Sequence, residues 1–290
     1  MRGWWQDFTD LVLPADCAGC GAPRTALCPR CRAALYGRAP RRVRPVPEPA
    51  GLPVVHAAAA YAEEVRALLL AHKERGALAL AGALGTALAG AVRAGLGGSG
   101  AGVPGRAAAG GAGAVLLVPV PSARWAVRAR GHDPVRRMAL AAAGELRRTG
   151  TPARVAAVLR QRRPVADQAG LDARRRLANL AGALEVTAGG GRLLGTGDVV
   201  LVDDLITTGA SLAEAARAVR EATAERTGVR TVVYGAVTRE GRDERRTGAR
   251  EESRNWVHGA SEKAAGNTVR HALRAAVIAA PRDSFEINRN

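Results

Sequence analysis

The stretch Val199-Val200-Leu201-Val202-Asp203-Asp204-Leu205-Ile206-Thr207-Thr208-Gly209-Ala210-Ser211 decides the fold of this 290-residue chain. Its apolar, β-branched start predicts a strand buried on both faces of a parallel sheet. Two carboxylates end that strand, a small hydroxyl-rich turn follows, and residues 212–219 continue as a helix. A helix N-terminus offers unpaired N–H groups and partial positive charge. Strand, turn and helix together therefore predict a phosphate site.

The side chains of this stretch suit a phosphorylated sugar. Thr207, Thr208 and Ser211 add hydroxyl donors, and Gly209 lets the backbone approach an anion closely. The two aspartates come at the carboxyl end of the strand, where ligands bind in open α/β sheets, and they can hold sugar hydroxyls or a magnesium ion. The alternative is an ordinary strand–helix turn with capping Asp, Ser and Thr, but capping alone does not require two acids and three hydroxyls.

All four cysteines lie in one short window, as Cys17-Ala-Gly-Cys20 and Cys28-Pro-Arg-Cys31. Two Cys-x-x-Cys pairs this close are typical of one tetrahedral, structural zinc ion with four thiolate ligands. Disulfides are the poorer explanation for a chain in a reducing cytoplasm. A redox Cys-x-x-Cys is poorer still, because there are two pairs and no strand–helix–strand context.

Composition gives a sizeable but unusual core. Hydrophobic residues make up 47% of the chain and aromatic residues only 3%, so the core must be built from Ala, Val and Leu. The net charge of +17 favours an anionic partner such as a nucleotide, pyrophosphate or nucleic acid, or else reflects a general bias towards Arg. We expect no apolar run near the roughly 20 residues that span a bilayer. With no signal-peptide core at the N-terminus, we expect a cytoplasmic protein.

The rest of the chain alternates between periodic segments and polar connections. We expect strands at 54–61 (at a sheet edge), 114–118, 153–160 and 229–238, and helices at 63–72, 77–93 and 135–148. Connecting segments are expected at 37–53 (rich in Pro and Arg), 94–114 (Gly and Ala), 161–176 (polar), 189–191 (a glycine turn) and 241–290, where only 269–280 has a helical pattern.

An arginine-rich segment follows the expected strand at 114–118. It contains Arg124, Arg128, Arg130, Arg136 and Arg137, interrupted by Gly131-His132-Asp133-Pro134. Since it follows a parallel strand, it belongs at the same rim of the sheet as Asp203. Several arginines there could clamp a pyrophosphate, or they could form a basic, solvated turn.

Taken together, the motifs resemble those of the ComF family of competence-associated, phosphoribosyltransferase-like proteins. The resemblance covers roughly residues 4–240 and rests on six features in the same order. These are the two cysteine pairs, 61–76 with Lys73, Val118-Pro119-Val120-Pro121, Arg128-Ala-Arg130-Gly131, 168–179 and 199–211. The chain departs from the family at His132 and Asp133, where an aromatic residue and an Asn are usual.

The resemblance implies a type I phosphoribosyltransferase fold at 54–240, with a flexible insertion at 94–114. A zinc module at 1–36, a linker at 37–53 and a poorly ordered extension at 241–290 complete the expected organisation. The implied ligand is phosphoribosyl pyrophosphate (PRPP) with Mg²⁺. The implied catalytic residues are Asp203 and Asp204, on the ribose hydroxyls, and zinc would be held by Cys17, Cys20, Cys28 and Cys31. The implied phosphate and pyrophosphate ligands are Thr207, Thr208, Gly209, Ala210, Ser211, Pro119, Val120, Arg128 and Arg130.

The resemblance leaves three functions open. One is an enzyme that transfers phosphoribosyl to an unidentified nitrogenous acceptor. Another is a non-catalytic sensor of PRPP or a nucleotide. The third is a DNA-uptake protein that binds single strands or the competence machinery; the net charge favours it, and the scarcity of aromatic stacking platforms opposes it.

Overall fold

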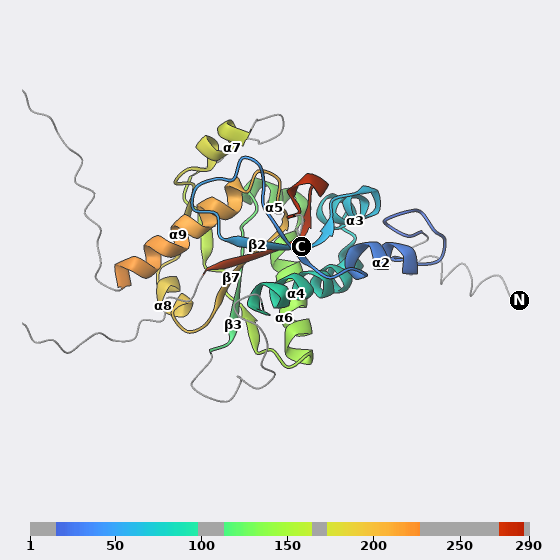
Figure 1. The fold of residues 1–290 in the computed structure, drawn as a ribbon, viewed down its shortest axis with the longest axis horizontal. Helices are drawn as coiled ribbons and strands as arrows, with labels where there is room; N and C mark the ends of the chain where they lie inside the picture. Colours follow the sequence, from blue (N-terminus) through green and yellow to red (C-terminus); the bar gives the residue numbers. More distant parts are fainter. Residues whose placement is uncertain (1–15, 98–112, 164–172, 227–272, 287–290) are drawn as a thin grey trace, which may run out of the picture.

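A six-stranded, mostly parallel sheet forms the centre of the molecule (Figure 1). The computed structural model describes residues 16–97, 113–163, 173–226 and 273–286. The strand order is β1-β2-β8-β7-β3-β4, and only the β1–β2 pair is antiparallel. The strands are β1 (Arg41–Val43), β2 (Val54–Ala60), β3 (Val115–Pro119), β4 (Ala153–Val155), β7 (Val199–Leu205) and β8 (Arg274–Ala280).

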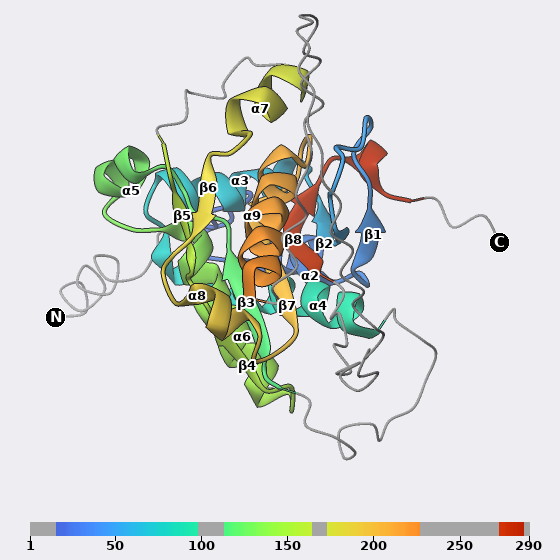
Figure 2. The same cartoon turned by 90° about the vertical axis from the view of Figure 1, so that its left-hand side faces the viewer.

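Helices cover both faces of this sheet, which confirms the predicted α/β class. One face carries α2 (Pro29–Tyr36), α3 (Glu63–Glu74), α4 (Ala81–Gly97) and α6 (Pro134–Arg148). The other face carries α8 (Gly190–Leu194), α9 (Ala210–Arg226) and a two-stranded sheet of β5 (Leu159–Gln161) and β6 (Leu184–Val186). Figure 2 shows α9 lying along β8, β7 and β3, with α4 and α6 on the far side.

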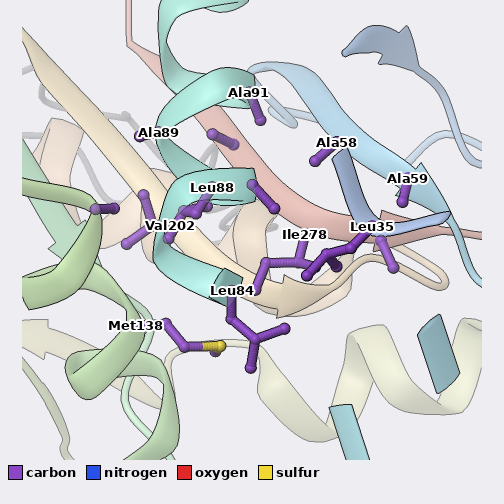
Figure 3. Packing of buried hydrophobic residues seen from close by; sticks show 14 of the residues in the cluster. Leu35, Ala58, Ala59, Leu84, Leu88, Ala89, Ala91, Met138, Val202 and Ile278 are labelled. Carbon is purple, nitrogen blue, oxygen red and sulfur yellow. The ribbon is translucent and has the colours of Figure 1, made fainter. Parts of the chain in front are cut away.

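Strand β7 explains why two cores form. Val200 and Val202 point into the cluster with α4 and α6, whereas Val199 and Leu201 point into the cluster with α9. Successive side chains of a strand face opposite sides, so a continuous apolar run is what a strand covered on both faces requires. Figure 3 shows the first cluster, in which Leu84 and Leu88 of α4 pack with Val202, Ile278 and Met138.

Helix α4 is more apolar than we expected from the sequence. Within the described residues, one helical segment, Leu78–Gly97, is long enough and apolar enough to cross a membrane by length and composition. The expectation that the chain contains no such apolar run is therefore wrong. Half of its most apolar window is buried inside the protein, and it packs against α6, β2 and β8. A short 3₁₀ turn, η1 (Leu78–Leu80), precedes the α-helix, and the helix extends into the expected Gly/Ala insertion as far as Gly97.

The end of the chain differs most from expectation. We expected residues 241–290 to be a poorly ordered extension with helical character at 269–280. Instead, Arg274–Ala280 is strand β8, buried between β2 and β7. Its sequence, RAAVIAA, is rich in alanine, the best helix former, so burial between two parallel strands has overridden local propensity. The strand expected at 229–238 lies outside the described residues.

Three further expectations are corrected. Part of the expected linker at 37–53 is the edge strand β1, whose Arg41 guanidinium lies 4.8 Å from the centre of the Phe285 ring, and β2 is therefore an inner strand. The expected strand at 153–160 is divided into β4 and β5, which belong to different sheets. Short helices replace expected loops at α7 (Ala173–Leu180), at α8 and at α5 (Arg124–Arg130).

Candidate functional site

The four cysteines converge on one point near the start of the described chain. The Sγ atoms of Cys17, Cys20, Cys28 and Cys31 all lie within 4.8 Å of one another, and the Cys20 and Cys28 sulfurs are 3.5 Å apart. Tetrahedral zinc–thiolate geometry, with Zn–S near 2.3 Å, requires sulfurs about 3.8 Å apart. The donor set therefore fits zinc, and four thiolates leave no open position for catalysis.

Backbone groups favour the thiolate form of Cys17, whereas burial and the neighbouring thiols raise the pKa of Cys31. The N–H of Cys28 donates to Cys17 Sγ over 3.3 Å, and the N–H of Cys31 donates to Cys28 Sγ over 3.4 Å. Burial raises the pKa of Cys17, but the backbone N–H groups around it outweigh burial and bring that pKa to about 6. A readily ionised thiol is what metal binding requires, because the ligand is the thiolate.

The cysteine cluster is packed into the main core. Cys17, Cys28 and Cys31 belong to the same buried cluster as Leu68 of α3. A Cβ at Gly19 would lie 2.7 Å from Cys31 Sγ and 3.4 Å from a methyl group of Leu68, so only glycine permits this approach. The expected zinc module at 1–36 is thus continuous with the α/β core over its described residues.

The second cluster of polar residues lies where the sheet changes direction. After β3 the chain runs through α6 to β4 on one side, and after β7 it runs through α9 to β8 on the other side. Helix α6 covers one face of the sheet and α9 the opposite face. The carboxyl ends of β3 and β7 therefore form a topological switch point, which is where open α/β sheets bind ligands.

Asp203 and Asp204 lie in the last three residues of β7, which ends at Leu205, and so lie at this switch point. The N–H of Asp204 donates to Asp203 Oδ1 over 2.8 Å. Asp204 is buried and Asp203 half-buried. Burial, and then the charge of Asp204, raise the pKa of Asp203 well above its ordinary value of 3.8; the opposing effects of Lys73 and the Asp204 N–H do not cancel this.

A lysine from a distant helix completes the pair. The Nζ of Lys73, in the last turn of α3, donates to Asp204 Oδ2 over 2.7 Å. Burial lowers the pKa of Lys73, but the charges of Asp204 and Asp203 and the hydrogen bond to Asp204 raise it above its ordinary value. Lys73 is therefore a permanent cation at neutral pH. The sequence showed Lys73 only as part of the family resemblance, because its partner lies 131 residues further along the chain.

The arginine-rich segment joins the same group through the end of α3. Arg130 Nε donates to Glu74 Oε2 over 2.9 Å. Arg130 Nη1 is buried and has no hydrogen-bond partner among the residues that the structure describes. His132 faces two backbone carbonyls, those of Arg130 (3.1 Å from Nδ1) and His72 (3.2 Å from Nε2). These contacts assign His132 to holding the turn against α3, and they leave Arg130 Nη1 as a buried donor without a partner among the described residues.

The other predicted ligands lie in three places: at the end of β3, on α5, and in the turn from β7 into α9. Pro119 and Val120 are buried at the end of β3, and the Val120 N–H donates to the Val202 carbonyl over 2.9 Å, so they lie beside the carboxylates. Arg128 is exposed on α5. Thr207 is exposed, while Thr208 and Ser211 are half-buried beside the first turn of α9, which begins at Ala210.

Backbone conformation and packing inside the protein explain why position 209 is a glycine. Its φ of +74° is in the left-handed region, which other residues rarely adopt. A Cβ there would lie 3.2 Å from Leu52 and Pro45 side-chain atoms, inside the protein. Its conformation makes the turn from β7 into α9, and close packing on the protein side adds a second constraint.

Surface shape does not single out this site. One hollow is lined by Thr25, Leu27, Pro29, Arg32 and Tyr36, beside the cysteine cluster, and another by α4 and α6 residues that include Glu145 and Arg148. Neither hollow contains Lys73, Asp203 or Asp204. The carboxylate cluster is therefore selected by its chemistry and its place in the topology. No family model matches this chain, and no curated protein is significantly similar to it.

Proposed function

We propose that this chain is a PRPP-binding, phosphoribosyltransferase-like protein of the ComF family, with a type I phosphoribosyltransferase fold. One observation carries the proposal. Adjacent carboxylates end the inner parallel strand β7 at the switch point, and a hydroxyl-rich turn then leads into the N-terminus of α9. Acceptors for sugar hydroxyls thus lie next to donors for a phosphate, which is the polarity of a phosphorylated ribose.

The roles of the residues follow from their chemistry. Asp203 and Asp204 accept hydrogen bonds from the ribose hydroxyls. The turn at 207–211 and the first N–H groups of α9 hold the 5′-phosphate. The free Nη1 of Arg130, together with Arg128 and the end of β3 at Pro119 and Val120, faces the pyrophosphate. Mg²⁺ arrives with PRPP and neutralises the charge of its pyrophosphate.

We propose that the protein then transfers phosphoribosyl to a nitrogenous acceptor. Displacement at the anomeric carbon passes through an oxocarbenium-like transition state, which needs positioning and a neutralised leaving group. No strong base is required. The position of His132 supports this assignment, because both of its ring nitrogens lie against backbone carbonyls. Zinc at the cysteines has a structural role only.

A second candidate is favoured by one exposed aromatic residue. Trp125 lies on α5 between Arg124 and Arg128, and 64% of its surface is exposed. An exposed ring among arginines suits a base of single-stranded nucleic acid, stacked on the ring with its phosphates on the arginines. Binding that falls steeply with salt and ignores PRPP would favour this function.

Calorimetric titration with PRPP and Mg²⁺ tests the proposal. We expect the wild type to bind, and Asp203→Asn combined with Asp204→Asn to lose that binding while keeping the fold. Glu185→Gln is the matched control, because Glu185 is a carboxylate in an ion pair with Arg160 on the separate two-stranded sheet. Equal affinity in the wild type and the double variant would refute the site.

A further inference from the structure

The carboxylate pair at the switch point already holds a cation. Lys73 Nζ is 2.7 Å from Asp204 Oδ2, and the charge of Asp203 also acts on it. Two adjacent carboxylates at the end of a strand would otherwise attract a divalent ion, which prefers carboxylate oxygens. The ammonium group, a compact point charge with three donors, therefore lies where such an ion would bind.

The structure holds Lys73 firmly at that position. Leu68, Leu69 and Ala71 bury the preceding turn of α3 in the core. His72 is buried, with its ring nitrogens 3.4 Å from the carbonyls of Ala77 and Pro134. The Lys73 side chain is only 35% exposed and that of Asp204 only 11%. This packing fixes the helix turn that carries Lys73, and the low exposure of both side chains means that water screens their contact less than it screens an ordinary surface ion pair.

The other charged groups nearby are already paired or positive. Glu74 is engaged by Arg130, so it does not compete for Lys73. Arg130 itself acts on Lys73 as a like charge, which further disfavours an additional cation. Counted as charged, Asp203, Asp204 and Glu74 carry −3, and Lys73 and Arg130 carry +2. Lys73 and Arg130 therefore reduce the net charge of the cluster from −3 to −1.

We propose that Lys73 is the built-in counter-cation of Asp203 and Asp204, so that the pair binds ribose hydroxyls directly and excludes a divalent metal. This inference rests on the proposed function for its sugar ligand, but its claim about metal exclusion stands on the geometry alone. It restricts Mg²⁺ to the pyrophosphate of PRPP. Lys73 acts through the carboxylates and is a positioning residue.

Metal binding gives the first test. Mn²⁺ is titrated into zinc-loaded protein and followed by the loss of its free electron paramagnetic resonance signal. We expect the wild type and the Asp203→Asn/Asp204→Asn variant to bind Mn²⁺ alike. Lys73→Met, which keeps the apolar stem, is expected to gain one site at least about tenfold tighter than any wild-type site. That site is expected to disappear when Asp203→Asn and Asp204→Asn are added.

The conservative variant Lys73→Arg keeps the cation and is expected to behave as the wild type does. A thermal melt of each variant confirms that it is folded. The proposal is overturned by a wild-type Mn²⁺ site that the two Asn substitutions remove. It is overturned equally if folded Lys73→Met gains no site.

Ribose 5-phosphate gives the second test, because it lacks the pyrophosphate that carries Mg²⁺. In metal-depleted buffer we expect wild-type protein to bind it with the same affinity as in millimolar Mg²⁺. Lys73→Met is expected to bind at least about tenfold more weakly without Mg²⁺ and to recover when Mg²⁺ is added. Wild-type binding that requires Mg²⁺ would overturn the inference and leave the proposed function intact. Failure of both ribose 5-phosphate and PRPP to bind would refute the proposed function, and the Mn²⁺ titration would still decide the role of Lys73.

Discussion

The cysteine cluster and the carboxylate cluster are built in opposite ways. The four thiols come from one local segment, 17–31, and two close Cys-x-x-Cys pairs bring them together. The carboxylate cluster joins β7 to α3, which lies 131 residues earlier, and to Arg130 through Glu74. A site formed by residues close together in the chain can be predicted from their spacing in the sequence. Of a site formed by distant segments, the sequence pattern predicts only the part that lies in one segment.

The two clusters also differ in what completes them. Four thiolates converge on one point, so a metal ion is their natural counter-charge. The carboxylates have Lys73. Both clusters nevertheless meet on α3, because Leu68 packs at the cysteines and Lys73 ends the same helix at Asp204.

Loss of one thiol is expected to have the largest effect. Cys31 is fully buried within the main core cluster, so Cys31→Ser should release zinc and destabilise the whole domain by about 4 kcal/mol or more. Elemental analysis and a denaturant titration measure the two effects. One zinc per wild-type chain is expected. A folded, reduced wild-type preparation without zinc would contradict this prediction, because the thiols would then need no metal.

A third polar contact joins distant segments of the chain without a ligand. Buried Glu214 of α9 accepts from the Leu184 N–H and from Arg217. Glu214→Ala should destabilise the protein by about 2–3 kcal/mol. Glu221→Ala removes the exposed partner of the same Arg217 and should cost less than about 0.5 kcal/mol. Chemical denaturation of both variants measures the difference, and equal losses would contradict it.

The pH dependence of the Glu214 contact has a defined sign. Burial raises the pKa of Glu214, but hydrogen bonds from Arg217 and Leu184 outweigh it and lower that pKa below 4.5. A lowered pKa in the folded state means that the contact stabilises fully above pH 4.5 and is lost as the pH falls further. The difference in unfolding free energy between the wild type and Glu214→Ala should therefore become smaller only in acid.

The neighbouring aspartates should respond with opposite signs. Asp204→Asn leaves the partly buried Lys73 without its partner, at a cost of about 1–2 kcal/mol. Asp203→Asn removes a carboxylate whose ionisation is unfavourable in the folded state, and should stabilise by about 1 kcal/mol at neutral pH. Thermal melts at neutral pH measure both.

The pKa of Asp203 is higher in the folded state than in the unfolded state, where it is near 3.8. The wild type therefore loses stability as the pH rises from 3.8 to the folded-state pKa, because only the unfolded chain ionises in that range. The advantage of Asp203→Asn should therefore vanish in acid and grow towards neutral pH. An advantage that stayed the same at every pH would show that the carboxylate is not responsible.

The parts of the fold that could be predicted from sequence are those with a local pattern. The apolar run of β7, the helix after it and the cysteine spacing each reflect residues that are neighbours in the chain. Strand β8 could not be predicted, because its alanines favour a helix and only burial between β2 and β7 makes them a strand. Lys73 was not assigned a role because pairing with Asp204 depends on how α3 crosses to the switch point.

Hydrogen–deuterium exchange with and without PRPP and Mg²⁺ shows whether the switch point of the sheet binds the ligand. We expect slower exchange in the ligand-bound protein at 203–213, at 118–120 and around Lys73, and unchanged exchange at 17–31. Protection confined to 17–31 or to α5, or equal protection in the Asp203→Asn/Asp204→Asn variant, would contradict the assignment of the switch point as the ligand site.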